Sequence, residues 1–318
     1  MAIAAAPAVR VLRPGLVTTI QDLGRWGWQS RGVSVAGPMD LFAHRRANLL
    51  VGNPREAATL EVTLQGPELE FEDTRLVAVS GAAFALTVDG HAVPTDAPFE
   101  VTRAARLAFG LRKAGARAYV AIDGGVSVTP VLGSRATHLP TRLGGLDGRS
   151  LAAGDRLPLG PPARGTTRRR ASSVPTSGPA RTQVVRVLPG PQEEYFTADA
   201  FEVLESGPYR IHVQSNRIGF RLEGPELVHL RRAEIISDPV PIGSVQVPGS
   251  GQPIVLMADR QTTGGYPKLA TVISADIGVM GQLAPGDEVR LRRCTLREAL
   301  AARIAQEQEL LALEGSQP

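Results

Sequence analysis

The amino-acid sequence predicts a mainly β protein with a few helices, built from two copies of one β-rich unit. Gly and Pro account for 34 and 25 of the 318 residues, a composition that favours short strands joined by turns over a helical bundle. Hydrophobic residues make up 43% of the chain but aromatic residues only 4%, so the core must consist mainly of Val, Leu, Ile and Ala. Short motifs of the first half also recur in the second half.

The recurring motifs are turn sequences, and each one alone is common in proteins. The pairs are 66–69 with 224–227, 153–157 with 285–289, and 11–15 with 187–190. Because all three pairs keep their order along the chain, they support duplication of one unit. Two copies meeting face to face would leave a cleft at their junction, where ligand sites are common.

Composition also divides the chain. Residues 161–183 are rich in Pro, Arg, Ser, Thr and Gly and contain almost no apolar residues, which is typical of a linker. We therefore expect an N-terminal subdomain over residues 1–160, a linker over 161–183, a C-terminal subdomain over 184–292, and a helix and tail over 293–318.

The first half begins with strand patterns at 9–12 and 17–20. A helix is predicted to open at Pro38, because proline fits the first helical position and apolar residues follow at helical spacing. The helix should end before Pro54. Between residues 58 and 160, apolar runs alternate with Asp-Gly turn signals, which predicts further strands.

In the second half, the apolar runs 254–257 and 269–273 predict two buried strands. A terminal helix is predicted from about residue 296, because Thr295 and Glu298 form a capping box at its start. Its large apolar side chains share one face, which we expect to pack on the β-rich unit or on a partner. They are Leu296, Leu300, Ile304 and Leu311.

Charge and cysteine content exclude several classes of protein. Part of the net charge of +4 lies in the arginine run 168–170, which we interpret as a solvated segment rather than a nucleic-acid site, because no RNA-binding motif accompanies it. The single cysteine, Cys294, excludes an internal disulfide and a thiolate metal cluster. The five histidines never lie four residues apart or beside the cysteine, so we expect no metal site on this chain.

Several other motifs are missing. The start of the sequence lacks the features of a signal peptide, and no apolar run approaches the roughly 18–20 residues of a membrane span, so we expect a cytoplasmic protein that does not enter a membrane. There is no phosphate-binding loop, dinucleotide fingerprint or nucleophile-elbow serine. Neither lysine lies between methionines, so we expect no covalent biotin on this chain.

The segment 259–268, between two predicted strands, is the strongest candidate for a site. Gly264 and Gly265 would let the backbone adopt positive φ and approach a ligand, and neighbouring amide groups could bind an anion. Tyr266 adds a flat face and Lys268 a mobile positive charge at the lip of the loop. Only two lysines occur in the chain, against 33 arginines. The alternative is an ordinary tight connection between strands.

Other polar residues have two interpretations each. Asp22 and Arg25 belong either to a packed loop or to a site wall where Arg25 meets a carboxylate or phosphate. Asp40 either favours the positive start of the helix or joins a site, as does Asn48 on the same helix. Four amides either cap turns or line a pocket for an amide or ureido ligand. These are Gln214, Asn216, Gln246 and Gln261.

Five separated blocks give the sequence a close resemblance to one known family. They are TTIQDLGR at 18–25, GPMD at 37–40, ANLLVGN at 47–53, QSNRIG at 214–219 and QTTGGYP at 261–267. The chain resembles allophanate hydrolase subunit 2, also described as the C subunit of the prokaryotic ATP-dependent 5-oxoprolinase. It is also similar to one half of the carboxyltransferase domain of urea carboxylase.

The resemblance implies two cyclophilin-like β-barrel subdomains, in line with the duplication. It implies an obligate partner, subunit 1 (the B subunit), and a third protein (the A subunit) for full activity, so a hetero-oligomer. The serine chemistry of allophanate hydrolysis belongs to an unrelated module, and its motif is absent here. ATP with Mg is expected at the level of the complex, with a small-molecule amide as substrate.

Three hypotheses of function follow. The first is a subunit of 5-oxoprolinase, in which phosphorylation of the lactam carbonyl oxygen makes ring opening feasible and demands positioning and charge stabilisation. The second is the carboxyltransferase half of a biotin-dependent urea carboxylase or allophanate-type system, with the loop binding the biotin ureido group. The third is a non-catalytic regulatory or scaffold subunit.

The candidate residues serve the first two hypotheses. Lys268, Arg217 and Arg25 would contact anions, and Asp22 or Asp40 would orient a cation. The candidate catalytic residues are Lys268, Arg25, Asp22 and Asp40. The candidate substrate- or anion-binding residues are Arg217, Asn216, Gln214, Gln246, Gln261, Thr262, Thr263, Gly264, Gly265, Tyr266 and Asn48.

Overall fold

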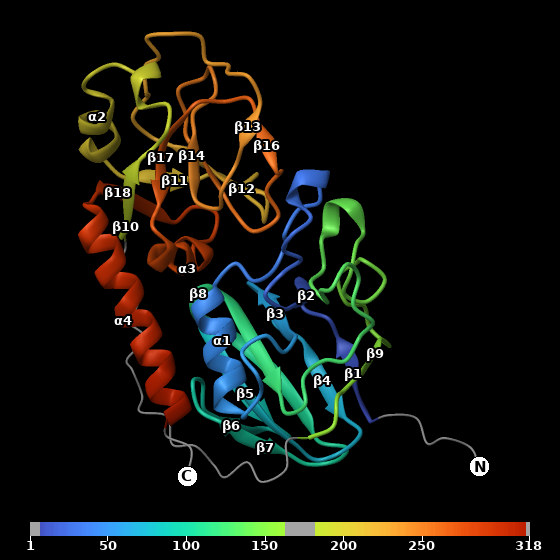
Figure 1. Cartoon of the computed structure of the whole chain (residues 1–318). Coiled ribbons are helices and arrows are strands. Elements are labelled where there is room, and N and C mark those ends of the chain that lie inside the picture. The colour runs from blue at the N-terminus through green and yellow to red at the C-terminus, as the bar shows by residue number, and fades with distance from the viewer. Residues whose placement is uncertain (1–6, 163–181, 316–318) are drawn as a thin grey trace. The chain divides into compact units, whose positions relative to one another are not determined.

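The computed structural model describes residues 7–162 and 182–315, and the chain divides into two compact units (Figure 1). The first unit contains Met1–Arg25, Ala36–Thr176 and Gln308–Pro318, and the second contains Trp26–Val35 and Ser177–Glu307. A short segment near the N-terminus therefore belongs to the second unit, and the last part of the chain belongs to the first. The predicted linker at 161–183 lies, except at its ends, outside the described residues.

The first unit is an antiparallel sheet of nine strands with one helix. The strands of its main path follow the order β2-β3-β8-β4-β1-β9, and β5 pairs with β6, β7 and β8. The elements are β1 (Ala8–Arg13), β2 (Val17–Gln21), α1 (Leu41–Leu50), β3 (Thr59–Thr63), β4 (Glu68–Phe71), β5 (Arg75–Val88), β6 (His91–Val93), β7 (Phe99–Val101), β8 (Arg106–Ile122) and β9 (Arg156–Pro158).

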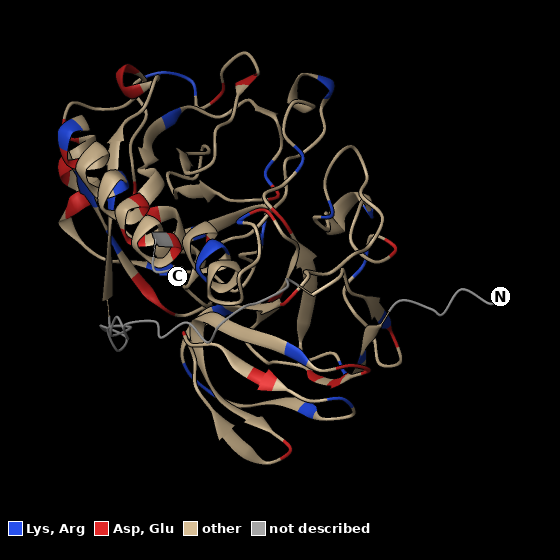
Figure 2. Ribbon diagram, turned by 60° about the horizontal axis from the view of Figure 1, so that its bottom comes forward, with Lys and Arg blue, Asp and Glu red and all other residues tan. Residues whose placement is uncertain are grey.

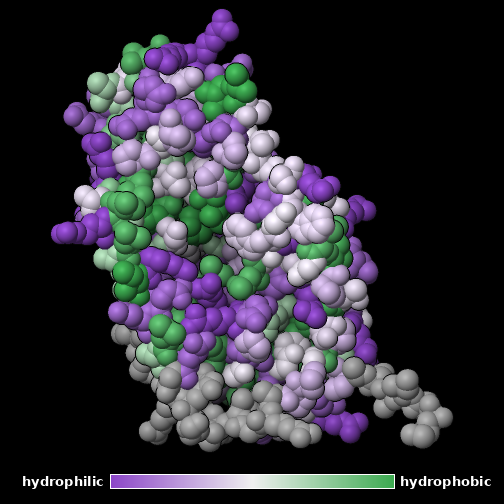
Figure 3. Space-filling view, viewed as in Figure 1, coloured by the Kyte–Doolittle hydropathy of each residue, from purple (hydrophilic) through white to green (hydrophobic). Residues whose placement is uncertain are grey.

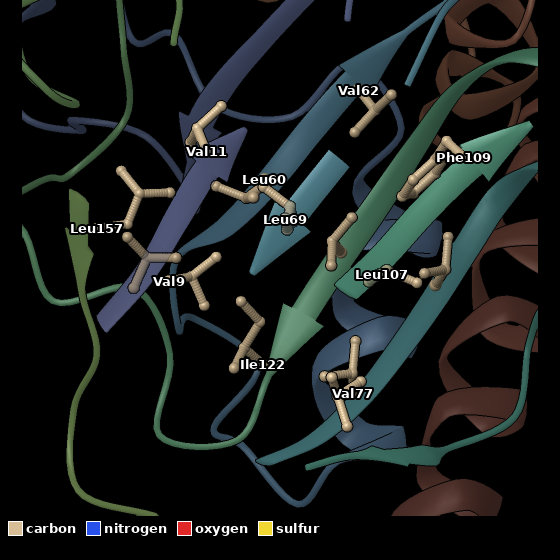
Figure 4. Close-up of a cluster of buried hydrophobic side chains, with 14 of the residues drawn as sticks. Val9, Val11, Leu60, Val62, Leu69, Val77, Leu107, Phe109, Ile122 and Leu157 are labelled. Atoms are coloured by element: carbon tan, nitrogen blue, oxygen red, sulfur yellow. The ribbon is translucent and has the colours of Figure 1, made fainter. Parts of the chain in front are cut away.

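The core of this unit consists mainly of aliphatic side chains, as the composition predicts. In Figure 4, side chains from several strands point into one shared space, among them Val9 on β1, Leu60 on β3 and Ile122 on β8, all fully buried. Burying each such side chain contributes about 1.5–3 kcal/mol to folding. The sheet is therefore held together by many small contacts rather than by a few large aromatic ones.

Helix α1 begins three residues later than the sequence predicts. Asp40 has extended backbone angles, and its side chain accepts a hydrogen bond from the Ala43 N–H at 3.0 Å, which makes Asp40 the N-cap. Pro38 therefore precedes the helix instead of occupying its first position. The inner face packs Ala43, Ala47 and Leu50 against the sheet, as expected.

The second unit is a closed barrel with the strand order β10-β17-β14-β15-β12-β11-β18. The neighbours are antiparallel except β10 and β18, which are parallel. A two-stranded ribbon of β13 and β16 is separate from this barrel. The elements are β10 (Thr182–Pro189), α2 (Ala200–Ser206), β11 (Tyr209–Ile211), β12 (Gly219–Glu223), β13 (Asp238–Pro239), β14 (Ser244–Gln246), β15 (Ile254–Leu256), β16 (Thr263–Gly264), β17 (Lys268–Val272), α3 (Ile277–Gly281) and β18 (Glu288–Arg293). Helix α4 (Leu296–Gly315) begins in this unit, and its residues from Gln308 on belong to the first unit.

The mainly β fold with few helices is confirmed. Figure 2 shows basic and acidic residues interspersed along the ribbon rather than gathered on one element. Within the described ranges, no helix combines the length and the apolar character that crossing a membrane requires.

One pair of recurring motifs forms the same turn in both units. The Gly154 N–H donates to the Val11 carbonyl at 2.8 Å, and the Gly286 N–H donates to the Ile211 carbonyl at 2.8 Å. Both glycines have φ of +90°, and the aspartate that follows each one accepts a backbone N–H from three residues earlier. The second turn therefore contacts β11. The recurring motifs would instead predict a contact with β10, because the motif at 11–15 in β1 recurs at 187–190 in β10.

We predict that Gly154→Ala and Gly286→Ala each destabilise the protein by about 1–2 kcal/mol, because an L residue with a Cβ is strained at positive φ. Both positions have open space around them, so the backbone angle alone should cause the loss. Chemical denaturation would measure it. Gly249→Ala is the matched control, since Gly249 does not have positive φ and has room for a Cβ; an equal loss in this variant would contradict the explanation.

Candidate functional site

The loop at 259–268 has a different conformation from the one predicted. Neither Gly264 nor Gly265 adopts positive φ, because Thr263 and Gly264 form strand β16 and pair with β13. Gly264 leaves room for two neighbouring side chains. A Cβ at this position would lie 2.7 Å from Gln246 Nε2 and 3.3 Å from Gln261 Nε2. The missing side chain therefore lets two glutamine amides approach the backbone.

Lys268 is not a mobile charge at the lip of the loop. It is the first residue of β17, and its side chain is only 1% exposed. Its Nζ lies 2.5 Å from Asp238 Oδ2 on β13. A buried ammonium needs such a partner, because an unpaired charge in the interior is very unfavourable.

Asp238 differs from Lys268 in that 41% of its side chain is exposed. The hydrogen bond from Lys268 lowers the pKa of the Asp238 carboxyl below its ordinary value. The group therefore stays ionised at neutral pH and can only accept hydrogen bonds. A carboxylate of this kind can take an N–H group of a ligand.

Gln192 completes the cluster. Its Nε2 lies 3.4 Å from Asp238 Oδ2, and its Oε1 accepts the backbone N–H of Lys268 at 3.2 Å. Sequence analysis missed both Gln192 and Asp238, since they lie 76 and 30 residues from Lys268 and belong to no motif. Only the paired strands bring them together.

The glutamine amides lie next to this cluster. Gln246 on β14 is the cross-strand partner of Lys268 and is 2% exposed, whereas Gln261 is exposed. Tyr266, with 41% exposure, leaves part of its ring in solvent. Each amide offers a donor and an acceptor, which is the pattern that an amide or ureido ligand requires. We define this group as the Asp238 cluster: Asp238, Lys268, Gln192, Gln246, Gln261 and Gly264.

Other predicted residues of the second unit have structural contacts. Arg217 is buried and donates through Nε and Nη2 to both oxygens of Asp259, at 2.9 Å each. Asn216 accepts the Ile218 N–H at 2.8 Å, which is a turn of the capping type. Gln214 is exposed, as is Thr263, while Thr262 accepts the Val240 N–H through its carbonyl.

Arg260 is a buried cation that the sequence analysis did not single out. Its Nε donates to the Val240 carbonyl at 2.8 Å, and burial lowers the pKa of its guanidinium to about 10. The guanidinium still carries its charge at neutral pH. It links the residue that follows β13 to the segment that precedes β16.

In the first unit, Asp22 and Arg25 hold a loop together. Asp22 accepts hydrogen bonds from the Gly24 N–H at 2.9 Å, the Ser134 hydroxyl at 2.6 Å and the Arg135 N–H. Arg25 is 1% exposed and donates to the Ala136 carbonyl. These contacts agree with the packed-loop interpretation of both residues.

The helix residues of the first unit also serve the fold. The Asn48 side chain donates to the Ala57 carbonyl at 2.8 Å and accepts from Asn53 at 3.1 Å, just where α1 ends. The Asp40 N–H donates to the Tyr119 hydroxyl at 2.7 Å, and this hydroxyl donates to Glu61 at 2.8 Å. The candidate residues therefore form two sets, one within each unit.

Two buried groups of the first unit have shifted pKa values. Burial raises the pKa of the Tyr119 hydroxyl well above its ordinary value. Burial also lowers the pKa of His44 to about 4, so His44 is neutral at pH 7, with Nδ1 2.9 Å from the Thr59 hydroxyl. Nothing in the sequence, apart from a position next to the predicted core, indicates that Tyr119 or His44 would have a shifted pKa.

The described parts of the chain contain no group of three or more His, Cys, Asp or Glu residues that could hold a metal ion. Gly264 is engaged with β13, and Lys268 is engaged with Asp238. The Lys268 ammonium is therefore not exposed at the lip of the loop, where a phosphate group could reach it.

Comparisons with known proteins agree with one another. The family described as carboxyltransferase domain, subdomain A and B, matches residues 31–293. The chain is 40% identical to the C subunit of 5-oxoprolinase from Escherichia coli, over 93% of this chain and 94% of that protein. It is 35% identical to the C subunit of 5-oxoprolinase from Haemophilus influenzae, over 90% of this chain and 91% of that protein.

Among solved structures, the K. lactis urea amidolyase is similar with a TM-score of 0.92 and 31% identity. The match covers 98% of this chain and 20% of that chain. This chain thus corresponds to only a small part of the urea amidolyase.

We predict that Asp238→Asn destabilises the second unit by about 1–2 kcal/mol at pH 7, between the values for exposed and buried ion pairs. Because the folded pKa of Asp238 is lowered, the stability from the pair is present above the unfolded pKa and is lost as pH falls through the folded pKa. The difference between wild type and variant should therefore vanish in strong acid. Thermal unfolding at a series of pH values would measure it.

A matched control is Asp147→Asn, since the Asp147 side chain is 76% exposed and lies 3.7 Å from Arg149. This variant should match the wild type at every pH. A difference between wild type and Asp238→Asn that stays constant down to strong acid would contradict the role given to the ion pair.

Proposed function

The chain belongs to the carboxyltransferase domain family of subdomains A and B, and from this we propose that it is the C subunit of an ATP-dependent 5-oxoprolinase. Such an assembly converts 5-oxo-L-proline, ATP and water into L-glutamate, ADP and phosphate. The observation that carries the proposal is the 40% identity to the C subunit of 5-oxoprolinase from Escherichia coli, which extends over nearly the whole of both chains.

The hydrogen-bonding groups of the Asp238 cluster are suited to binding an amide substrate. The ring of 5-oxoproline presents one N–H donor and one carbonyl acceptor, and it carries a carboxylate. The Asp238 carboxylate would accept the ring N–H, and the Gln261 amide, which is exposed, would donate to the carbonyl oxygen. Holding the ring through both groups would keep the carbonyl carbon in a constant position for attack.

Lys268 is a positioning residue in this proposal. Its ammonium is buried and reaches Asp238 instead of the solvent, so it would act on the substrate only through that carboxylate. Gln192 holds the same oxygen and the Lys268 backbone. Both residues would keep Asp238 ionised and aimed in one direction.

ATP with Mg belongs to the assembly as a whole in this proposal, and it would phosphorylate the lactam carbonyl oxygen. In this proposal the loop of this chain would not hold the phosphate groups, which is supported by the pairing of its ammonium with Asp238 and by the place of Gly264 in β16. We therefore assign ATP to another chain of the assembly, and we propose that the B and A subunits of the same system are the partners. A cytoplasmic location is consistent with such an assembly.

The alternative is the carboxyltransferase half of a urea carboxylase type of system. The likeness to K. lactis urea amidolyase, with a TM-score of 0.92, favours it. A biotin ureido group also presents N–H donors beside a carbonyl, so the same glutamines and Asp238 would recognise it. A purely regulatory or scaffold role is the third alternative, in which the cluster contacts no substrate.

We predict that Gln261→Ala lowers kcat/KM for 5-oxoproline roughly tenfold and Asp238→Asn roughly a hundredfold, as expected for the loss of a neutral and of a charged hydrogen bond. The measurement is ATP-dependent glutamate release by this chain co-purified with the B subunit and supplemented with the A subunit. Gln65→Ala, an exposed glutamine of the first unit, should retain full activity. Full activity in Asp238→Asn would exclude the cluster from the reaction.

The alternative leads to a different result. If this chain is a carboxyltransferase half, the intact assembly should release no glutamate, and this chain should bind a carboxylated biotin carrier protein more tightly than the unmodified carrier. Asp238→Asn should then weaken binding of the carrier. Surface plasmon resonance with both forms of the carrier would measure this, and equal binding of the two forms would reject the alternative.

A further inference from the structure

The binding mode proposed for 5-oxoproline leaves one group of the substrate without a partner. The carboxylate of 5-oxoproline is attached to the ring carbon next to the ring nitrogen, so it would lie near Asp238, which accepts the ring N–H in the proposed function. Two carboxylates brought close together repel each other, and taking a carboxylate out of water is unfavourable unless a cation pairs with it. A substrate of this kind therefore requires a further cation near the Asp238 cluster.

The three buried cations of the second unit already have other partners. The Lys268 ammonium pairs with Asp238. The Arg217 guanidinium binds both oxygens of Asp259. Arg260 donates to main-chain carbonyl groups. All three side chains are buried, so a carboxylate that approaches the cluster from the solvent would need a different cation.

Arg231 is an exposed cation that a chain of contacts connects to the cluster. Its N–H and the N–H of Leu230 both donate to the Tyr195 carbonyl, at 3.4 and 2.8 Å. The Tyr195 N–H donates to the Gln192 carbonyl at 3.1 Å, and Gln192 Nε2 lies 3.4 Å from Asp238 Oδ2. One short turn therefore separates the residue that holds Arg231 from the residue that contacts Asp238.

The chain returns to the cluster a few residues after Arg231. The Ile235 N–H donates to the Gly265 carbonyl at 2.8 Å, and Asp238 on β13 is the cross-strand partner of Gly264 on β16. The segment from Arg231 to Asp238 is thus a loop whose two ends are both attached to residues of the cluster or to their neighbours.

The surface near this loop is mixed in character. Figure 3 shows a hydrophobic patch bordered by hydrophilic side chains near the place of β13 in Figure 1. In the loop itself, Ile236 is 94% exposed, and Arg231, Arg232 and Glu234 are exposed as well. The ring of 5-oxoproline combines apolar methylene groups with a carboxylate, so it matches a surface of this kind.

No acid neutralises the charge of Arg231. Within the residues that the structure describes, no carboxylate forms an ion pair with its guanidinium, whose carbon instead lies 5.3 Å from the centroid of the Tyr195 ring. A ring holds the flat face of a guanidinium and leaves N–H groups at its edge available for both oxygens of a carboxylate. Arg232, the next residue, has no ring contact of this kind in the same part of the chain.

We propose that Arg231 binds the carboxylate of the substrate, and that the Asp238 cluster therefore takes a carboxylate-bearing amide rather than a neutral one. The contact rests on the function proposed for the cluster and names the class of substrate that the site accepts. Arg231 is then a binding residue that determines specificity. Tyr195 is a positioning residue, since it acts on the substrate only through Arg231.

The first test is the kinetics of ATP-dependent glutamate release by this chain co-purified with the B subunit and supplemented with the A subunit. Arg231→Gln should raise KM for 5-oxoproline about tenfold, as expected for the loss of a charged hydrogen bond, while kcat changes much less. Arg232→Gln is the matched control and should leave both constants unchanged. An active assembly in which Arg231→Gln has the wild-type KM would overturn the proposal.

Variants of Tyr195 test the positioning of the guanidinium in the same assay. Tyr195→Ala should raise KM, because the ring that holds Arg231 is removed. Tyr195→Phe should retain the wild-type KM, because the ring is retained and the hydroxyl has no role in the contact. Equal effects of the two substitutions would exclude the ring contact.

The second test measures binding without turnover, by isothermal titration calorimetry of this chain co-purified with the B subunit. The ligands are 5-oxoproline and γ-butyrolactam, which has the same lactam ring without the carboxylate. Arg231→Gln should weaken binding of 5-oxoproline about tenfold and leave binding of γ-butyrolactam unchanged. Added salt should also weaken only the binding of 5-oxoproline, because it screens the ion pair.

The two tests separate the carboxylate contact from the proposed reaction. If the wild type binds 5-oxoproline through Arg231 but the assembly releases no glutamate, the proposed reaction is wrong and the contact stands. If the assembly releases glutamate and Arg231→Gln binds 5-oxoproline as tightly as the wild type does, the contact is wrong and the reaction stands. A wild type that binds both ligands equally, or does not bind 5-oxoproline, would also overturn the contact.

Discussion

An ammonium group that is buried without a partner costs too much free energy for a stable fold. In the second unit this constraint explains the contacts that Lys268 makes. Strand β17 belongs to the closed barrel, whereas β13 and β16 form a ribbon of only two residues each. A ribbon of that size is not stable on its own. The Lys268–Asp238 pair ties β13 to β17, and so attaches the ribbon to the barrel.

Further contacts extend the pairing within the ribbon itself. The Ile235 N–H donates to the Gly265 carbonyl and the Val240 N–H to the Thr262 carbonyl, while Gly264 leaves room for the buried Gln246. The ribbon also carries the Asp238 carboxylate, which together with Gln261 exposes polar atoms of the cluster to solvent. In the proposed function, the stability of this unit and its recognition of a ligand would therefore depend on the same ion pair.

Much of the fold could be predicted from the sequence, because strands, turns and caps are local. The Gly-Asp turns at 154–155 and 286–287, the aliphatic core and the inner face of α1 all leave local patterns, and each is present in the structure. The start of α1 was misplaced because proline is tolerated before a helix as well as at its first position. The long strands β5 and β8 were only partly predicted, since register shifts between them interrupt the alternation.

The site was harder to predict for a physical reason. A charged side chain beside glycines leaves the same sequence pattern whether it faces a ligand or closes a loop. Only the residues that it contacts in the folded chain show which of the two it does. Asp22 and Arg25 bind backbone and side chains of the segment 134–136, and Arg217 binds Asp259. Lys268 was singled out because lysine is rare in this chain, but its partner Asp238 comes from a separate strand with no motif of its own.

The chemistry of the Asp238 cluster also explains why one scaffold can occur in proteins named for different reactions. A lactam and a ureido group both place an N–H beside a carbonyl, so the Asp238 carboxylate and the exposed Gln261 amide would recognise either one. Under the proposed function, recognition at this cluster would therefore not select between hydrolysis and carboxyl transfer. The selection must lie in the group delivered to the bound amide, a phosphoryl group or a carboxyl group. Under the proposed function, the reaction would therefore be decided by the protein that brings this group.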